Sequence, residues 1–177
     1  MKQILSFAII IALSFTAFTA SAQEATDKSK RPSPPASVTQ TIASGATVHI
    51  DYSQPSVKGR VIGSKDLEPR DGTVWRTGAN EATVFEIDKD VKINGQSLPA
   101  GKYGLFSISG KDSWVIIFNK TWKQWGAYDY KESEDALRVN VKPAKAAAFS
   151  EKMTFVVDKN GTVNLFWGDI QVGFEVK

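Results

Sequence analysis

Apolar and polar residues alternate with a period of two along most of the chain after residue 38. Residues 47–52 illustrate the pattern, because Val48, Ile50 and Tyr52 are separated by polar neighbours, as in a strand with one buried face. Turn-forming pairs such as Asn94-Gly95 separate such segments. The same alternation recurs in residues 82–87, 103–108, 114–118, 137–141, 153–157, 162–167 and 170–176.

This spacing predicts an all-β protein. About eight or nine short strands, with turns roughly every 8–12 residues, are typical of an antiparallel β-sandwich or a partly open barrel. Evidence for helices is thin, since only residues 133–136 and 144–149 suit one or two short helices. Strands do not alternate with long helices, which argues against a nucleotide-binding fold with a parallel sheet.

The first 22 residues have the three parts of a secretory signal peptide. Lys2 precedes a mostly apolar run over residues 4–18, and Ala20 and Ala22 give the small-x-small pattern that precedes cleavage. A permanent membrane anchor needs roughly 20 apolar residues. Cleavage is therefore expected between Ala22 and Gln23, with the mature protein in the periplasm or secreted, and no membrane span is expected afterwards.

Three regions follow from these patterns. Residues 1–22 form the signal peptide, residues 23–37 read as a proline-rich polar tether, and residues 38–177 are expected to form a single β-sandwich domain. The chain has 177 residues, of which 42% are hydrophobic, enough for one core.

Composition excludes several kinds of chemistry. Cys is absent, which removes disulfides, thiolate nucleophiles and Cys-ligated metals. The single His, His49, excludes sites with several His ligands, and a Ser-His-Asp triad would have to use it. The net charge of +3, from 22 basic and 19 acidic residues, is too small and dispersed to predict a nucleic-acid partner. No cofactor and no metal are expected.

The most informative string is residues 74–83, Val-Trp-Arg-Thr-Gly-Ala-Asn-Glu-Ala-Thr. Trp75 offers a ring for stacking and Arg76 a fork of donors, while Asn80 adds an amide and Glu81 an acceptor. That combination suits a sugar or a small carboxylate. In the structural alternative, Arg76 and Glu81 form an ion pair that pins a loop between two strands.

Four further residues complete the candidate ligand site. Tyr52 ends a predicted strand, and Lys58 and Arg60 follow in a loop that would attract an anion, although solvated loop charges are the alternative. Trp125 belongs to an aromatic-rich stretch over residues 114–130 and is the best candidate for an exposed ring that stacks on a sugar. The other rings of that stretch are expected to fill the core or to cap its edge.

Six segments carry a resemblance to a known family, and the Trp-Arg-Thr-Gly-Ala-Asn-Glu string is the most specific part. They are residues 31–35, 50–55, 58–60, 74–83, 98–106 and 125–128. From residue 31 onward the chain resembles the exported bacterial family catalogued as domain of unknown function 2911. The resemblance implies an exported, β-rich protein and brings no reaction with it. Members usually have Pro-Tyr-Gly before the Trp-Arg pair, where this chain has Pro69-Arg70-Asp71-Gly72. The rim beside the motif is therefore expected to be more charged and less aromatic than in other members.

These features predict an exported, non-catalytic binding module for a small ligand, a glycan or a partner protein. A polysaccharide hydrolase is the alternative from another class, with a carboxylate pair drawn from Glu81, Asp129 and Asp135. A structural interaction module attached by the tether is the third. Two carboxyl groups about 5–9 Å apart in one cleft would favour the hydrolase. A groove with exposed Trp and Arg side chains favours binding.

Overall fold

The computed structural model describes residues 27–177, so the expected signal peptide lies outside the described residues. This part of the chain folds into eleven strands, with two single-turn 3₁₀ helices at Lys28–Lys30 and Glu132–Glu134. The strand pairs are all antiparallel, which confirms the predicted all-β sandwich. Neither helix of residues 27–177 is long and apolar enough to cross a membrane.

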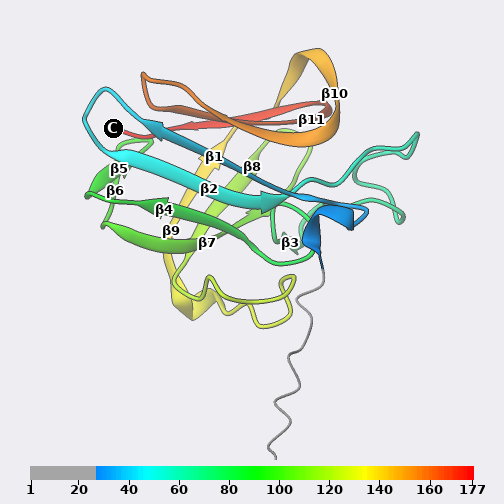
Figure 1. Cartoon of the computed structure of the whole chain (residues 1–177), viewed down its shortest axis with the longest axis horizontal. Helices are drawn as coiled ribbons and strands as arrows, with labels where there is room; N and C mark the ends of the chain where they lie inside the picture. The colour runs from blue at the N-terminus through cyan, green and yellow to red at the C-terminus, as the bar shows by residue number, and fades with distance from the viewer. Residues whose placement is uncertain (1–26) are drawn as a thin grey trace, which may run out of the picture.

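The larger layer is a seven-stranded sheet (Figure 1). Six strands lie side by side in the order β1 (Pro35–Thr41), β2 (Thr47–Ser53), β4 (Thr83–Ile87), β7 (Gly101–Ile108), β8 (Trp114–Asn119) and β9 (Asp135–Val141). The short strand β3 (Val74–Trp75) pairs with residues 107–108 of β7, whereas β4 pairs with residues 101–105 of the same strand. Residues 76–82 are therefore a loop between two strands that share one neighbour.

The second layer is the long hairpin of β10 (Ala144–Val157) and β11 (Thr162–Glu175), which crosses above the sheet in Figure 1. A smaller hairpin, β5 (Val91–Ile93) with β6 (Gln96–Leu98), adjoins the end of the chain through a bridge between Ile93 and Val176.

The core lies between the sheet and the long hairpin. Phe85 and Phe118 from the sheet meet Phe174 of β11 edge to face, with ring centroids 5.0–6.0 Å apart. Tyr52 packs edge to face on Phe155 of β10, and its hydroxyl accepts a hydrogen bond from the Phe155 N–H at 3.2 Å. Burial alternates along β4, as the period of two predicts.

The structure differs from the sequence prediction at three points. β1 begins at Pro35, inside the range expected to be a tether, and its residues are only half-buried or exposed. Residues 144–149 start a strand rather than a helix, because Ala144 pairs with Gln171 and this pairing outweighs the helix propensity of alanine. There are also more strands than the eight or nine expected, since β3, β5 and β6 have only two or three residues each.

Candidate functional site

The loop of residues 76–82 is fixed by hydrogen bonds within its own segment and to β7. The Thr83 hydroxyl donates to the Thr77 carbonyl at 2.7 Å, and the buried Thr77 hydroxyl lies 3.0 Å from that of Ser107. Thr77 and Asn80 adopt positive φ angles of 50° and 59°. A Cβ at Gly78 would lie 2.8 Å from Thr83 Oγ1, so close packing requires glycine there.

Trp75 is part of the core. Only 2% of the residue is exposed, its ring stacks on Trp167 at 5.7 Å, and its indole N–H donates to the Gly78 carbonyl at 3.0 Å. One ring face and the N–H are therefore committed to the fold, and with 2% of the residue exposed the structure does not provide the expected stacking of Trp75 on a ligand.

Asn80 and Glu81 hold the N-terminal segment. Arg31 Nη1 donates to both carboxylate oxygens of Glu81, at 3.1 and 2.9 Å, and Lys28 Nζ lies 3.0 Å from Oε1. The Asn80 side-chain amide donates to the Ser33 carbonyl at 2.9 Å. The Arg76–Glu81 ion pair of the structural alternative does not form, because the partners of Glu81 come from the segment before β1.

The ionisation of Glu81 reflects these contacts. Partial burial opposes the charge, but hydrogen bonds from its own backbone, Lys28 and Arg31 outweigh burial and lower the pKa of Glu81 below its ordinary value. A carboxylate held in this way is a fixed anion at neutral pH and a poor proton donor.

Arg76 forms no ion pair in the described part of the chain, although the carboxylate of Glu68 lies close enough to act on its charge. Its guanidinium makes no ion pair or hydrogen bond within residues 27–177, and its Nε is buried. The nearby carboxylate of Glu68 instead pairs with Arg70 at 3.6 Å. Burial lowers the pKa of Arg76, and the proximity of Tyr128 and Glu68 opposes that shift.

The Arg76 side chain borders a cavity of about 270 Å³, called here the Arg76 recess. Tyr128 stands at its rim and is 84% exposed. The recess is lined by Glu68, Val74, Trp75, Arg76, Ala127 and Tyr128.

The other predicted basic residues serve the loop that follows β2. The Arg60 guanidinium donates to the carbonyl oxygens of Ser56, Val57 and Asp66 at 2.6–3.2 Å, and therefore shapes its own loop. The Lys58 backbone N–H donates to a carboxylate oxygen of Glu151 at 2.8 Å. With Tyr52 committed to the core, none of the three residues lines the Arg76 recess.

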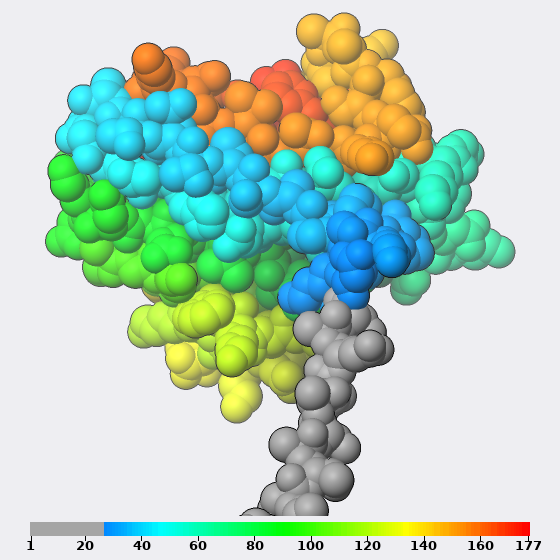
Figure 2. Space-filling model, viewed as in Figure 1, coloured from blue at the N-terminus to red at the C-terminus, as the bar shows by residue number. Residues whose placement is uncertain are grey.

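The aromatic loop, residues 120–134, lies next to the Arg76 recess and forms the yellow-green protrusion at the bottom of Figure 2. Trp122 is 37% exposed and Trp125 is 51% exposed, although the sequence favoured a core position for Trp122. Lys102 Nζ lies 5.5 Å from the Trp122 ring centroid, and Arg31 lies 5.8 Å from that of Trp125.

A polar network centred on Asp135, which the sequence suggested only as a hydrolase carboxylate, anchors both ends of the aromatic loop. The fully buried Asn119 donates to Asp135 Oδ1 at 2.7 Å, while Tyr130 and Arg138 donate to Oδ2 at 2.8 and 2.6 Å. Burial, together with the hydrogen bond to Asp135, raises the pKa of Tyr130 to about 12. Apart from Asp135, the signal in the sequence was an Asn at the end of a predicted buried strand.

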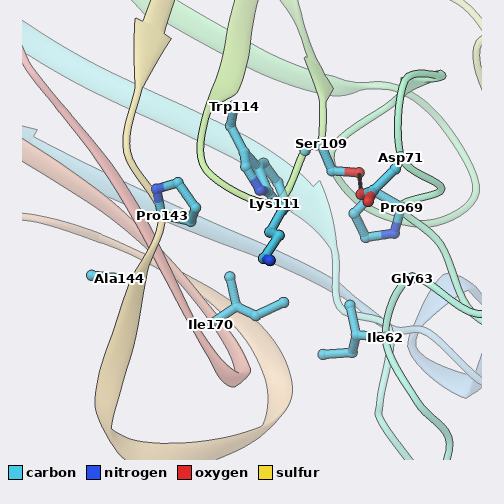
Figure 3. A pocket seen from close by; sticks show the side chains of 11 residues that line it. Ile62, Gly63, Pro69, Asp71, Ser109, Lys111, Trp114, Pro143, Ala144 and Ile170 are labelled. Carbon is cyan, nitrogen blue, oxygen red and sulfur yellow. Dashed lines mark hydrogen bonds between the residues drawn. The ribbon is translucent and has the colours of Figure 1, made fainter.

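A further cavity of about 340 Å³ lies where the loop after β2 meets the turn between β7 and β8 (Figure 3). Ile62, Ile170 and Trp114 give it apolar walls, and the Lys111 side chain extends between them. Its buried hydroxyl, Ser109, already bonds to Asp71 at 2.9 Å. The cavity therefore lacks the unpartnered buried donor that distinguishes the Arg76 recess.

The described residues offer little for metal chemistry. Across residues 27–177, no group of three or more His, Asp or Glu side chains is placed to hold a metal ion.

Fold and site together define a two-layer antiparallel β-sandwich with an arginine recess beside an aromatic loop. Residues 33–176 match the family described as Protein of unknown function (DUF2911), and the chain belongs to that family. The match spans both the loop of residues 76–82 and the aromatic loop. No curated protein and no solved structure matches the chain.

Proposed function

We propose that this chain is an exported, non-catalytic binding module whose ligand is a small carboxylate-bearing molecule or acidic sugar held by Arg76. The observation that carries the proposal is that Arg76 makes no ion pair within residues 27–177 and that its buried Nε has no hydrogen-bond partner there. Charged groups that are removed from water are ordinarily paired, and leaving one unpaired is costly. A bound carboxylate would supply the missing ion-pair partner and accept two parallel hydrogen bonds from the guanidinium.

The shape of the Arg76 recess supports a small ligand. Its volume of about 270 Å³ is below the range typical of sites for drug-sized molecules. The exposed ring of Tyr128 at the rim offers an apolar face for the carbon skeleton and a hydroxyl for a polar contact.

Two of the three carboxylates named for a hydrolase, Glu81 and Asp135, are already engaged in the fold. Glu81 is held by Lys28 and Arg31, and Asp135 accepts hydrogen bonds from Asn119, Tyr130 and Arg138. Both groups already have structural partners, whereas a glycoside hydrolase needs one carboxyl group that is free to give up a proton. Binding is therefore the better-supported function.

The test replaces Arg76 and measures stability and binding together. We expect Arg76→Met to melt at or slightly above the wild-type temperature, because it removes a partly buried charge without a partner. Galacturonate, a small sugar carboxylate, is the probe, and we expect it to raise the melting temperature of the wild type because a ligand of the native state stabilises it. Arg76→Met should lose this rise. Arg76→Lys keeps the charge but not the fork of donors, so it should retain part of the ligand-induced rise in melting temperature.

Lys142→Met is the matched control, because it removes a positive charge from an exposed position just after β9. It should leave ligand-induced stabilisation unchanged. A strongly destabilised Arg76→Met would show that the guanidinium supports the fold, and an absence of stabilisation by any small carboxylate in the wild type would refute the proposed function.

A further inference from the structure

A groove of about 460 Å³ borders the aromatic loop and holds both exposed indoles, Trp122 and Trp125. It shares Lys28, Glu81, Ala82 and Val84 with a neighbouring recess of about 280 Å³. The two together are called here the aromatic groove. The larger part is lined by Lys28, Glu81, Ala82, Val84, Trp122, Lys123, Gln124 and Trp125.

Gln124 gives the aromatic groove an unused hydrogen-bond acceptor within the described residues. Gln124 is only 8% exposed, and its amide nitrogen donates to the Thr121 carbonyl at 2.7 Å, whereas its Oε1 has no partner in residues 27–177. Lys28 and Glu81 add a cation and a carboxylate to the wall. Flat indole rings beside such groups match a pyranose ring, which has an apolar C–H face and hydroxyls around its edge.

Gly126 places the aromatic groove next to the Arg76 recess. Its N–H donates to the Asn80 carbonyl at 2.9 Å, and the preceding residue, Trp125, forms a backbone bridge with Glu81. A Cβ at Gly126 would lie 3.7 Å from Arg76 Nη1 and 3.2 Å from the Tyr128 ring. One stretch of backbone thus separates the exposed indoles from the guanidinium.

We propose that the Arg76 recess and the aromatic groove are neighbouring subsites for one acidic oligosaccharide. A uronate carboxylate would bind Arg76, and adjoining sugar rings would stack on Trp125 and Trp122. This inference rests on the proposed function, because it assigns the anion at Arg76 to a unit of a longer glycan. An extended acidic peptide is the competing occupant, and it does not explain two exposed rings beside an amide with a free acceptor.

Calorimetry of the mature protein with four probes tests the inference: galacturonate, tetragalacturonate, the neutral cellotetraose and a tetraglutamate peptide. We expect tetragalacturonate to bind at least about tenfold more tightly than galacturonate, since each stacked ring adds affinity. Cellotetraose should bind weakly because it has no carboxylate for Arg76. Trp125→Ala and Trp122→Ala should each weaken tetragalacturonate binding about tenfold while leaving galacturonate binding unchanged.

Phe149→Ala is the control for these variants, because Phe149 is 58% exposed and lies on β10, away from the aromatic loop. It should bind all probes as the wild type does. Equal affinity for galacturonate and tetragalacturonate would refute the proposed oligosaccharide subsites but would still support an anion site at Arg76. Tighter binding of a tetraglutamate peptide would assign the groove to an acidic peptide. Loss of binding to every acidic probe would refute the proposed function itself.

Discussion

At the scale of single residues, Glu81 joins segments that are far apart in the chain. Its carboxylate accepts two hydrogen bonds from Arg31, 50 residues earlier, and pairs with Lys28. Asn80, the residue before it, holds the Ser33 carbonyl in the same segment. The sequence nominated four residues of the 74–83 string as ligand contacts. Two of them, Asn80 and Glu81, instead position the segment that leads into β1.

We expect Glu81→Gln to lower the free energy of unfolding by about 1 kcal/mol at pH 7, because the ion pairs are partly exposed. The pKa of Glu81 is lower in the folded protein, so the contribution of its charge is fully present above the unfolded-state pKa and is lost as the pH falls through the folded value. When urea unfolding is measured between pH 7 and pH 3, the difference in the free energy of unfolding between Glu81→Gln and the wild type should decrease towards zero.

Glu132→Gln is the control for that experiment, since the Glu132 side chain is 75% exposed and, within residues 27–177, forms an ion pair with Arg138 alone, at 3.3 Å. It should change stability little at either pH. If the gap between Glu81→Gln and wild type stays constant down to pH 3, the charge of Glu81 is not the source of its contribution.

Tyr130 gives a second prediction, at alkaline pH. Its folded-state pKa of about 12 exceeds the ordinary value of 10.0, so the stability that the neutral phenol contributes is present below pH 10 and is lost as the pH rises towards 12. We expect Tyr130→Phe to cost about 1 kcal/mol at pH 7 through the lost hydrogen bond to Asp135. It should also remove the last step in the tyrosinate absorbance titration, whereas Tyr128→Phe should leave that step in place.

At the scale of elements, the turn between β10 and β11 depends on a glycine. Gly161 has a φ of 90°, and a Cβ there would overlap the backbone carbonyl of Val176. Gly95 has a similar φ of 84° but open space around it. We expect Gly95→Ala to cost about 1 kcal/mol from backbone strain and Gly161→Ala to cost about 3 kcal/mol or more, as overlap adds to strain. Equal losses in chemical denaturation would contradict this reading.

The same scale shows why the fold was largely predictable. The strands β2, β4, β7, β8 and β9 each bury alternate or continuous apolar residues, and their sequence pattern predicted them within a few positions. The sequence did not predict β1, because this strand contains polar residues and lies at the sheet edge, with no fully buried position. The sequence did not predict the start of β10 as a strand, because its alanines favour a helix and pairing with β11 outweighs this preference.

At the scale of the whole molecule, the site was only partly predictable. The sequence nominated Arg76 and Trp125, which lie on either side of Gly126 in the structure. It also nominated Trp75, Tyr52 and Arg60, which the tertiary packing uses mainly for the core or a loop. Trp75 still borders the Arg76 recess, and Tyr52 borders the smaller part of the aromatic groove. Residue type alone does not distinguish a buried indole from an exposed one, because both depend on what the long hairpin covers.

The N-terminal residues give the last prediction, which concerns the whole chain. Lys2, the apolar run and the Ala20-Ser21-Ala22 tripeptide predict export and removal of the first 22 residues. The intact mass of protein recovered from the periplasm or medium should correspond to a chain that begins at Gln23. Ala22→Arg should block processing, because the peptidase admits only small side chains there, and a longer chain should accumulate at the membrane. Exported protein that retains Met1 would show that the segment is not a cleaved signal.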